Sequence, residues 1–190
     1  MKELVHVHKT FEKIVYKDQK VSSREFENCT FKNCDFTNTT FISSQFMDCE
    51  FIDCNLSMVD FLGTSLKNIT FQNCKLLGIP FQNGDDFLFQ VAFENCALDF
   101  ASFTHKKMPK TRFFNCSMKE VSFVGTQLKQ SSFEKCDLMG TIFNDTNLSE
   151  CNFVTASNYQ IDPEFNVLKK AKFSLQGIPG LLEKYDIKII

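Results

Sequence analysis

A large apolar residue recurs at every fifth position through most of the chain. In the first part of the chain these residues are Phe26, Phe31, Phe36, Phe41, Phe46 and Phe51. Phe or Leu then holds each fifth position as far as Phe81, and the spacing resumes from Phe93 to Phe153 with Phe, Leu or Met at each step. A strand repeats every two residues and an amphipathic helix every 3.6, so neither accounts for a period of five. The chain must instead turn a corner every five residues.

The residue two places before each large residue forms a second series of small or β-branched side chains. Every cysteine belongs to this series: Cys29, Cys34, Cys49, Cys54, Cys74, Cys96, Cys116, Cys136 and Cys151. The spacing of Cys29 and Cys34 formally permits a zinc pair. The shared position favours a small buried hydrophobe instead. We therefore expect no metal, no cofactor and no disulfide.

Four turns of five residues close a square coil of 20 residues, with both series pointing inwards. Such coils stack through backbone hydrogen bonds at about 4.8 Å. Residues 20 apart should then form columns, and one such column is Phe93, Phe113, Phe133, Phe153 and Phe173. The sequence predicts an all-β solenoid over residues 21–160, in which each coil depends on its neighbours.

The five-residue phase breaks once, because Phe81 and Phe93 are separated by two residues too many. Asn83, Gly84, Asp85 and Asp86 form a turn signal inside this break, which we place near 82–92. One interpretation is a bulge that restores the register. The other is a projecting recognition loop whose candidate residues are Asp85, Asp86, Phe87 and Phe89.

Both ends depart from the repeat. Residues 1–20 keep only part of the pattern, and we expect them to be a cap over the first open edge. Residues 161–190 read as a degenerate last coil followed by a short amphipathic helix over 177–187. That helix either caps the rod or pairs two subunits across a two-fold axis.

The formal net charge of −2 argues against a protein that grips nucleic acid or an anionic membrane mainly by charge. Acidic side chains are nevertheless concentrated between residues 25 and 60, at Glu25, Glu27, Asp35, Asp48, Glu50, Asp53 and Asp60. These residues form either a negative rod that fits a basic groove or an ordinary solvated surface.

A basic corner points the other way, and it comprises Lys106, Lys107, Lys110 and Arg112. Lys106 falls in the small inward series, so we expect a distorted corner or a side chain that turns outwards. The corner either contacts an acidic partner or is an ordinary solvated turn.

No catalytic motif is present: the sequence lacks Gly-x-Ser-x-Gly, His-Glu-x-x-His, Walker and Gly-x-Gly-x-x-Gly patterns. A narrow coil filled by side chains also offers little room for a substrate pocket. The first 20 residues carry no apolar signal-peptide core, and no stretch is apolar enough to span a bilayer. We expect a cytoplasmic, non-enzymatic protein.

The repeat unit, as in Cys34-Asp35-Phe36-Thr37-Asn38 and Cys136-Asp137-Leu138-Met139-Gly140, resembles that of the pentapeptide-repeat family. The resemblance implies a right-handed quadrilateral β-helix. The tail is similar to that of the Qnr-type and MfpA-type members, whose terminal helix with paired leucines joins two β-helices end to end. By this resemblance the dimer contacts are Leu181, Leu182, Tyr185 and Ile187.

The same resemblance implies a function. Those members bind DNA gyrase and topoisomerase IV, mimic duplex DNA and protect the enzymes from quinolones. The alternative is a scaffold or interaction module with an unknown protein partner and no link to topoisomerases. Such a module would bind through the phase-break loop or the basic corner.

Overall fold

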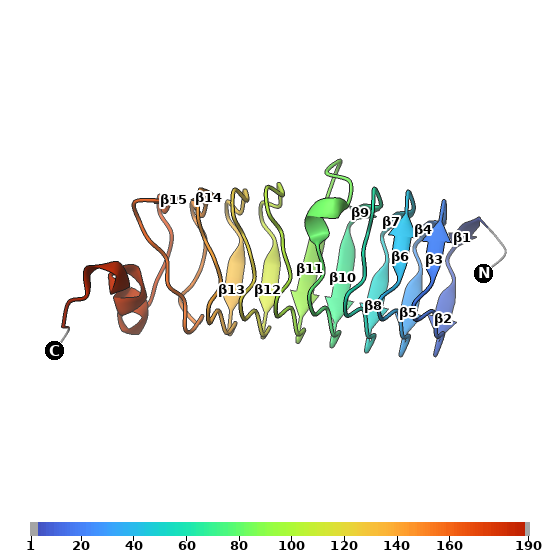
Figure 1. Ribbon diagram of the computed structural model, residues 1–190, viewed down its shortest axis with the longest axis horizontal. Helices are drawn as coiled ribbons and strands as arrows, with labels where there is room; N and C mark the ends of the chain where they lie inside the picture. Colours follow the sequence, from blue (N-terminus) through green and yellow to red (C-terminus); the bar gives the residue numbers. More distant parts are fainter. Residues whose placement is uncertain (1–3, 189–190) are drawn as a thin grey trace.

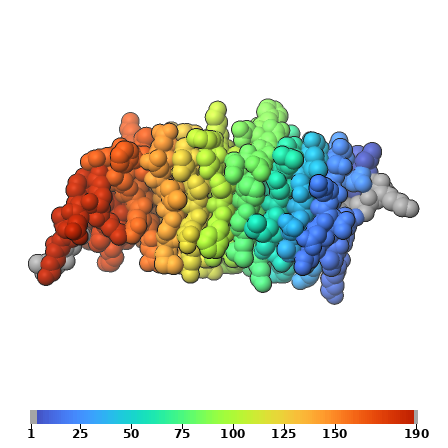
Figure 2. All heavy atoms as spheres, viewed as in Figure 1, coloured from blue at the N-terminus to red at the C-terminus, as the bar shows by residue number. Residues whose placement is uncertain are grey.

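A computed structural model describes residues 4–188 as a β-solenoid of about 8 turns. Figure 1 shows the coils stacked side by side along one axis, with the two ends of the chain at opposite ends of the rod. The predicted all-β solenoid of square coils is thereby confirmed. In Figure 2 the rod is continuous, and light-green atoms from the region of the phase break stand out along its upper edge.

The corners of the square are residues with left-handed backbone conformation. They recur every five residues, two places after each large inward residue, and include Asn28 (φ 49°), Asn33 (φ 53°) and Asn38 (φ 57°). Asn and Asp tolerate this conformation better than other side chains with a Cβ. The abundance of Asn and Asp at these places therefore has a backbone cause.

The flat sides of the square are short parallel strands from successive coils. We call the four sides the first to fourth faces, in the order in which the chain visits them. The first face contains the sheet β1 (Val5–Val7), β4 (Glu25–Glu27), β7 (Gln45–Met47) and β9 (Ser65–Lys67). Bridges that join Lys107 to Gln127 and Gln127 to Asn147 continue this face towards the C-terminus.

The second face contains the longest sheet. Its strands are β2 (Thr10–Glu12), β5 (Thr30–Lys32), β8 (Glu50–Ile52), β10 (Ile69–Gln72), β11 (Val91–Glu94), β12 (Arg112–Phe114) and β13 (Ser132–Glu134). Single bridges such as Asp35 to Asn55 build the third face. On the fourth face β3 (Lys20–Ser22) pairs with β6 (Thr40–Ile42).

The large residues fill the core as stacked columns. Phe113 lies between Phe93 and Phe133, with ring centroids 5.2 Å and 5.0 Å away. It also meets Phe123 of the fourth face edge-on at 5.9 Å. All nine cysteines are buried between these columns. The interior is thus occupied by side chains along the rod.

Residues 4–20, which the sequence assigns to a cap, have the conformation of an ordinary coil. Strands β1 and β2 pair with β4 and β5 in the regular 20-residue register. Phe11 stacks on Phe31 with ring centroids 4.9 Å apart. This first coil covers the edge of the second.

The C-terminal coil is irregular. Strand β14 (Thr146–Asn147) pairs with β15 (Asn166–Val167). The chain then forms two 3₁₀ helices, η2 (Leu175–Leu181) and η3 (Glu183–Tyr185). The helix expected over 177–187 is therefore split and begins earlier. Pro179 lies inside η2, and proline disfavours a regular α-helix at that place.

Candidate partner-binding surface

The phase break is a projecting loop, visible beside β9 and β11 at the upper edge of Figure 1. It begins after the 3₁₀ helix η1 (Phe81–Asn83). The next buried residue of the first face is Phe89, so the chain takes three residues more than a regular turn. It then reaches Phe93 in four residues, one fewer than usual. The net excess of two agrees with the pairing of Ile69 with Val91.

The coil that carries the loop is one residue short between Phe89 and Phe93, and a groove lies at this place. Asn68 and Lys110 are left-handed corner residues in the flanking coils, whereas the left-handed residue of the coil between them is Leu88 (φ 58°), which precedes Phe89. The resulting groove has a volume of about 330 Å³. Its lining includes Asn68, Thr70, Leu88, Pro109, Lys110 and Arg112.

Lys106 contradicts the expectation of a distorted corner or an outward side chain. Its side chain points inwards and is only 1% exposed. The ammonium group donates hydrogen bonds to Gly84 O (2.7 Å) and to Asp86 Oδ1 (2.6 Å). It also lies 4.8 Å from the centroid of the Phe89 ring. Lys106 thus fills, from the next coil, the inward position that the loop leaves empty.

The loop presents two apolar side chains to solvent. Phe87 is 65% exposed and Leu88 is 63% exposed. The Phe87 amide donates to Asp85 Oδ1 (3.0 Å), and Lys67 Nζ lies 5.2 Å from the Phe87 ring centroid. Of the predicted loop residues, Phe89 belongs to the core and Asp86 anchors the loop. The sequence interpretation missed Leu88, because its exposure follows only once Phe89 is known to lie in the core.

The predicted acidic residues surround the N-terminal half of the rod without forming a stripe on one face. Glu25 and Glu27 lie on the first face, Glu50 on the second, Asp35 on the third and Asp60 on the fourth, while Asp48 and Asp53 occupy corners. Some carboxylates belong to polar ladders between coils: Asn68 Nδ2 donates to Asp48 Oδ1 at 2.6 Å, and Asn73 Nδ2 donates to Asp53 Oδ1 at 3.0 Å. A hydrogen bond from the Thr37 hydroxyl, with one from the Thr37 amide, holds the pKa of Asp35 below its usual value.

The remaining residues of the basic corner are exposed. Lys107 lies on the first face, Lys110 at the corner and Arg112 on the second face. Arg112 lies 3.5 Å from Glu94 and 4.8 Å from the Phe114 ring centroid. The corner is therefore a solvent-exposed cationic surface next to the groove.

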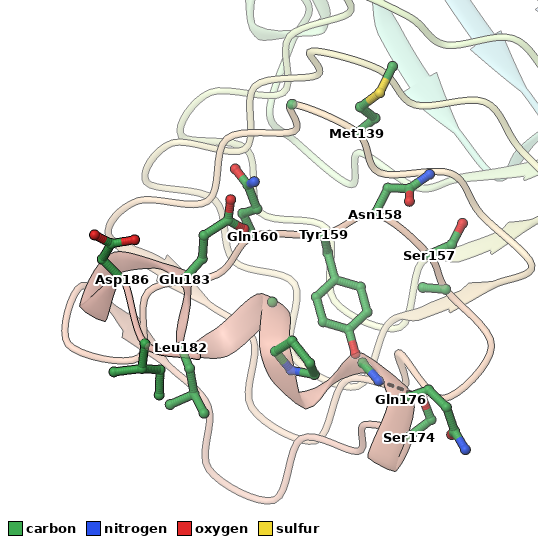
Figure 3. Close-up of a pocket in the computed structure, with 16 residues that line it drawn as sticks. Met139, Ser157, Asn158, Tyr159, Gln160, Ser174, Gln176, Leu182, Glu183 and Asp186 are labelled. Atoms are coloured by element: carbon green, nitrogen blue, oxygen red, sulfur yellow. Dashed lines mark hydrogen bonds between the residues drawn. The ribbon is translucent and has the colours of Figure 1, made fainter. Parts of the chain in front are cut away.

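The C-terminal end contains a cavity of about 790 Å³ between the last coils and η2. Figure 3 shows Tyr159 at its centre, with Gln160, Leu182 and Glu183 around it. Helix η2 approaches closely here because Gly177 and Gly180 face Tyr159. A Cβ at Gly177 would lie 1.8 Å from the Tyr159 hydroxyl oxygen.

The four residues expected at a dimer interface have different surroundings. Leu181 packs against the core of its own chain. Leu182 lines the cavity, whereas Tyr185 is 52% exposed and Ile187 is 56% exposed. Lys184 fastens this segment to the last coil through Asp162 (2.7 Å) and Glu164 (2.8 Å). The hydrogen bond from Lys184 lowers the pKa of Asp162.

Two of the buried thiols, Cys49 and Cys151, are kept protonated by their burial in the core. Burial raises the pKa of Cys49 and of Cys151 to about 12. Among residues 4–188, no group of three or more His, Cys, Asp or Glu is arranged to hold a metal ion. Over the same residues, no helix has the length and apolar character needed to cross a membrane.

Comparison with known proteins identifies the repeat architecture. Two trypsin-treated variants of QnrB1, a plasmid-mediated fluoroquinolone resistance protein, are similar at 19% and 20% identity. They cover 95% and 98% of this chain, which covers 100% and 99% of theirs, with TM-scores of 0.67 and 0.65. HetL, a pentapeptide-repeat protein involved in heterocyst differentiation regulation from the cyanobacterium Nostoc sp. strain PCC 7120, has 12% identity, coverages of 90% and 89%, and a TM-score of 0.50.

At these identities the likeness concerns the fold. No curated protein sequence matches the chain. A family model for the pentapeptide repeat region matches residues 24–85 and 87–174, and its interruption coincides with the projecting loop. The chain belongs to the pentapeptide-repeat family.

Proposed function

We propose that this chain is a non-enzymatic, cytoplasmic protein that binds DNA gyrase or topoisomerase IV in place of duplex DNA and protects the enzyme from fluoroquinolones. The observation that carries the proposal is the likeness of the whole rod to QnrB1, a fluoroquinolone resistance protein. The shared fold supplies the shape, and the acidic N-terminal half supplies the charge.

The placement of the acidic residues supports a DNA-like surface. Duplex DNA carries negative charge around its circumference, at about one charge per 1.7 Å of axis. Carboxylates on all four faces of the N-terminal half offer a weaker and less regular version of that field. A basic DNA-binding groove would attract this half of the rod.

The test is a gyrase supercoiling assay with ciprofloxacin and the purified full chain. Wild-type protein should restore supercoiling, and direct binding to gyrase should weaken as salt increases. The triple variant Glu25→Gln/Glu27→Gln/Glu50→Gln should lose most of this protection. These side chains keep their size and lose only their charge.

The matched control is Glu120→Gln/Glu134→Gln, which removes charge from the C-terminal half. It should protect as well as the wild type. Absence of both binding and protection by the wild-type chain, at a molar excess over gyrase and over topoisomerase IV, would refute the proposal.

A specific observation favours a second candidate, an interaction module with another protein partner. Phe87 and Leu88 are exposed on a loop that Lys106 holds in place. A fixed apolar pair of this kind suits insertion into a partner's pocket. Crosslinking from the loop should then yield a partner other than a topoisomerase, and Phe87→Ser/Leu88→Ser should abolish the crosslink. Capture of gyrase alone would contradict this candidate.

We also propose that the C-terminal end pairs two copies end to end. The support is the exposed apolar surface of Tyr185 and Ile187 beside Leu182. Leu182→Asp/Ile187→Asp should reduce the sedimenting mass of the end-to-end species. Leu181 is unsuitable for this test because it packs in the core of its own chain.

A further inference from the structure

The first face of the rod is divided into an acidic half and a basic half, with the projecting loop between them. Before the loop its carboxylates are the exposed Glu25 and Asp48, the half-buried Glu27 and, at the edge, the exposed Glu50. After the loop its exposed cationic residues are Lys107, Lys110, Lys129, Lys169 and Lys170. The exceptions are Arg24 and Lys67 in the first half and Asp145 and Glu150 in the second, and Glu150 lies 3.5 Å from Lys129. We infer that this face is a self-complementary surface on which a second copy of the chain docks, side by side and antiparallel.

In an antiparallel pair, the order of the coils places acidic residues of one copy opposite basic residues of the other. In an antiparallel pair the two-fold axis would lie between the coil of Ser65–Lys67 and the coil that carries the loop. One coil away from this axis, Asp48 of one copy then faces Lys107 and Lys110 of the other. Two coils away, Glu25 and Glu27 face Lys129. Each contact occurs twice, because a two-fold interface uses the same patch on both subunits.

The apolar centre of the pair would be the loop itself. Phe87 and Leu88 are the most exposed apolar residues next to this axis. In the paired arrangement the two loops meet, so each chain covers the apolar side chains of the other. Exposed ion pairs contribute little by themselves. The apolar contact therefore supplies most of the affinity, while the charges determine the antiparallel orientation.

The charge pattern favours a second copy over nucleic acid. A polyanion lying along the basic half would meet Glu25, Glu27 and Asp48 in the other half of the same face. A phosphate backbone carries one sign of charge throughout and cannot match both halves. A second copy matches both. The formal net charge of −2 also gives the whole chain no general attraction to polyanions.

This inference goes beyond the proposed function, which needs only one copy of the chain. It also uses a different surface from the end-to-end contact, because the first face runs along the side of the rod. Side-by-side pairing would cover Glu25 and Glu27, so it would compete with any partner that binds these residues.

The test is analytical ultracentrifugation of the full chain in low and high salt, with charge reversals at one facing pair. Wild-type protein should self-associate in low salt and dissociate as salt increases. Glu25→Lys and Lys129→Glu should each weaken association by about tenfold, because each change creates two like-charge contacts. The combination Glu25→Lys/Lys129→Glu should restore association to near the wild-type value.

Lys75→Glu, a reversal on the third face, is the matched control and should leave association unchanged. Leu182→Asp should leave the salt-sensitive association in place. A monomeric wild type, or a dimer that Leu182→Asp abolishes and the reversals do not affect, would overturn the inference. A monomer whose binding to a DNA oligonucleotide is lost in Lys107→Glu/Lys110→Glu would equally overturn it, in favour of nucleic acid.

Discussion

Lys106 Nζ lies 2.6 Å from Asp86 Oδ1, and the two side chains have opposite environments. The lysine is 1% exposed, whereas the aspartate is 72% exposed. The pair therefore joins a charge inside the solenoid to one on its surface. The contact fixes a loop that has left the regular path of the coil.

This asymmetry predicts unequal costs for removing the two partners. Asp86→Asn leaves a buried ammonium without its counter-charge, and we expect a loss of about 3 kcal/mol in the free energy of unfolding. Lys106→Met removes the buried charge and leaves Asp86 in water, so we expect about 1–2 kcal/mol, mainly from the bond to Gly84 O. Urea unfolding of the two variants measures which substitution lowers the free energy of unfolding more.

Asp85→Asn, on the neighbouring exposed residue, is the control for a change of charge at this loop and should alter stability by less than about 0.5 kcal/mol. An equal cost for Asp86→Asn and Lys106→Met would contradict the asymmetric account of the pair.

Alkaline pH should destabilise the protein through its buried thiols. The pKa of Cys49 and of Cys151 is about 12 in the folded chain and 9.0 in the reference state. Above about pH 9 the unfolded chain releases these protons while the folded chain keeps them, so stability falls as pH rises. Between about pH 8 and pH 10.5 the loss is roughly 2 kcal/mol per thiol.

Urea unfolding at several pH values measures this slope. Cys49→Ser/Cys151→Ser should flatten it by roughly 4 kcal/mol over the same range, because serine does not titrate there. The same inward series already accepts Ser44 and Ser131. An unchanged slope in the double variant would show that other groups dominate the alkaline transition.

Much of the fold follows from the five-residue period. The period predicts the inward columns and the positions of the nine cysteines, since both depend only on spacing within one unit. The distribution of acidic residues over four faces could also have been derived, because the coil position of Glu50 or Asp60 follows from its number. A continuous stripe would have required acidic residues 20 apart.

The loop shows where this reasoning ends. The numbering shows only that two extra residues lie between Phe81 and Phe93. A path with three extra residues before Phe89 and one fewer after it has the same length as a path with two extra residues in a single turn. Only the burial of Phe89 on the first face distinguishes these paths. The inward orientation of Lys106 could not be predicted from the repeat either. The space that its side chain fills is left by the loop of the preceding coil, and the repeat that contains Lys106 gives no sign of it.

The close packing of η2 on Tyr159 predicts that two glycines are essential at the C-terminal end. A Cβ at Gly180 would lie 2.2 Å from the Tyr159 carbonyl oxygen, so Gly180→Ala should displace the helix. Gly177→Ala should do the same through the Tyr159 hydroxyl. Hydrogen exchange should accelerate over 175–185 in both variants and stay unchanged in the central coils. Gln176→Ala, at the exposed position just before Gly177, should behave as wild type. Protection retained in the glycine variants would contradict the packing account.

The stacked Phe column predicts a dependence on position along the rod. Phe113 is fully buried between two rings, so Phe113→Ala should cost about 3–5 kcal/mol by leaving a cavity. Phe173 stacks on Phe153 at 5.2 Å near the irregular end and is only partly buried, so Phe173→Ala should cost about 1–2 kcal/mol. Phe113→Leu should cost about 1.5 kcal/mol or less, because leucine fits equivalent slots such as Leu128. Thermal and urea unfolding measure the loss in the free energy of unfolding for all three variants. Equal losses for Phe113→Ala and Phe173→Ala would contradict a dependence on position along the rod.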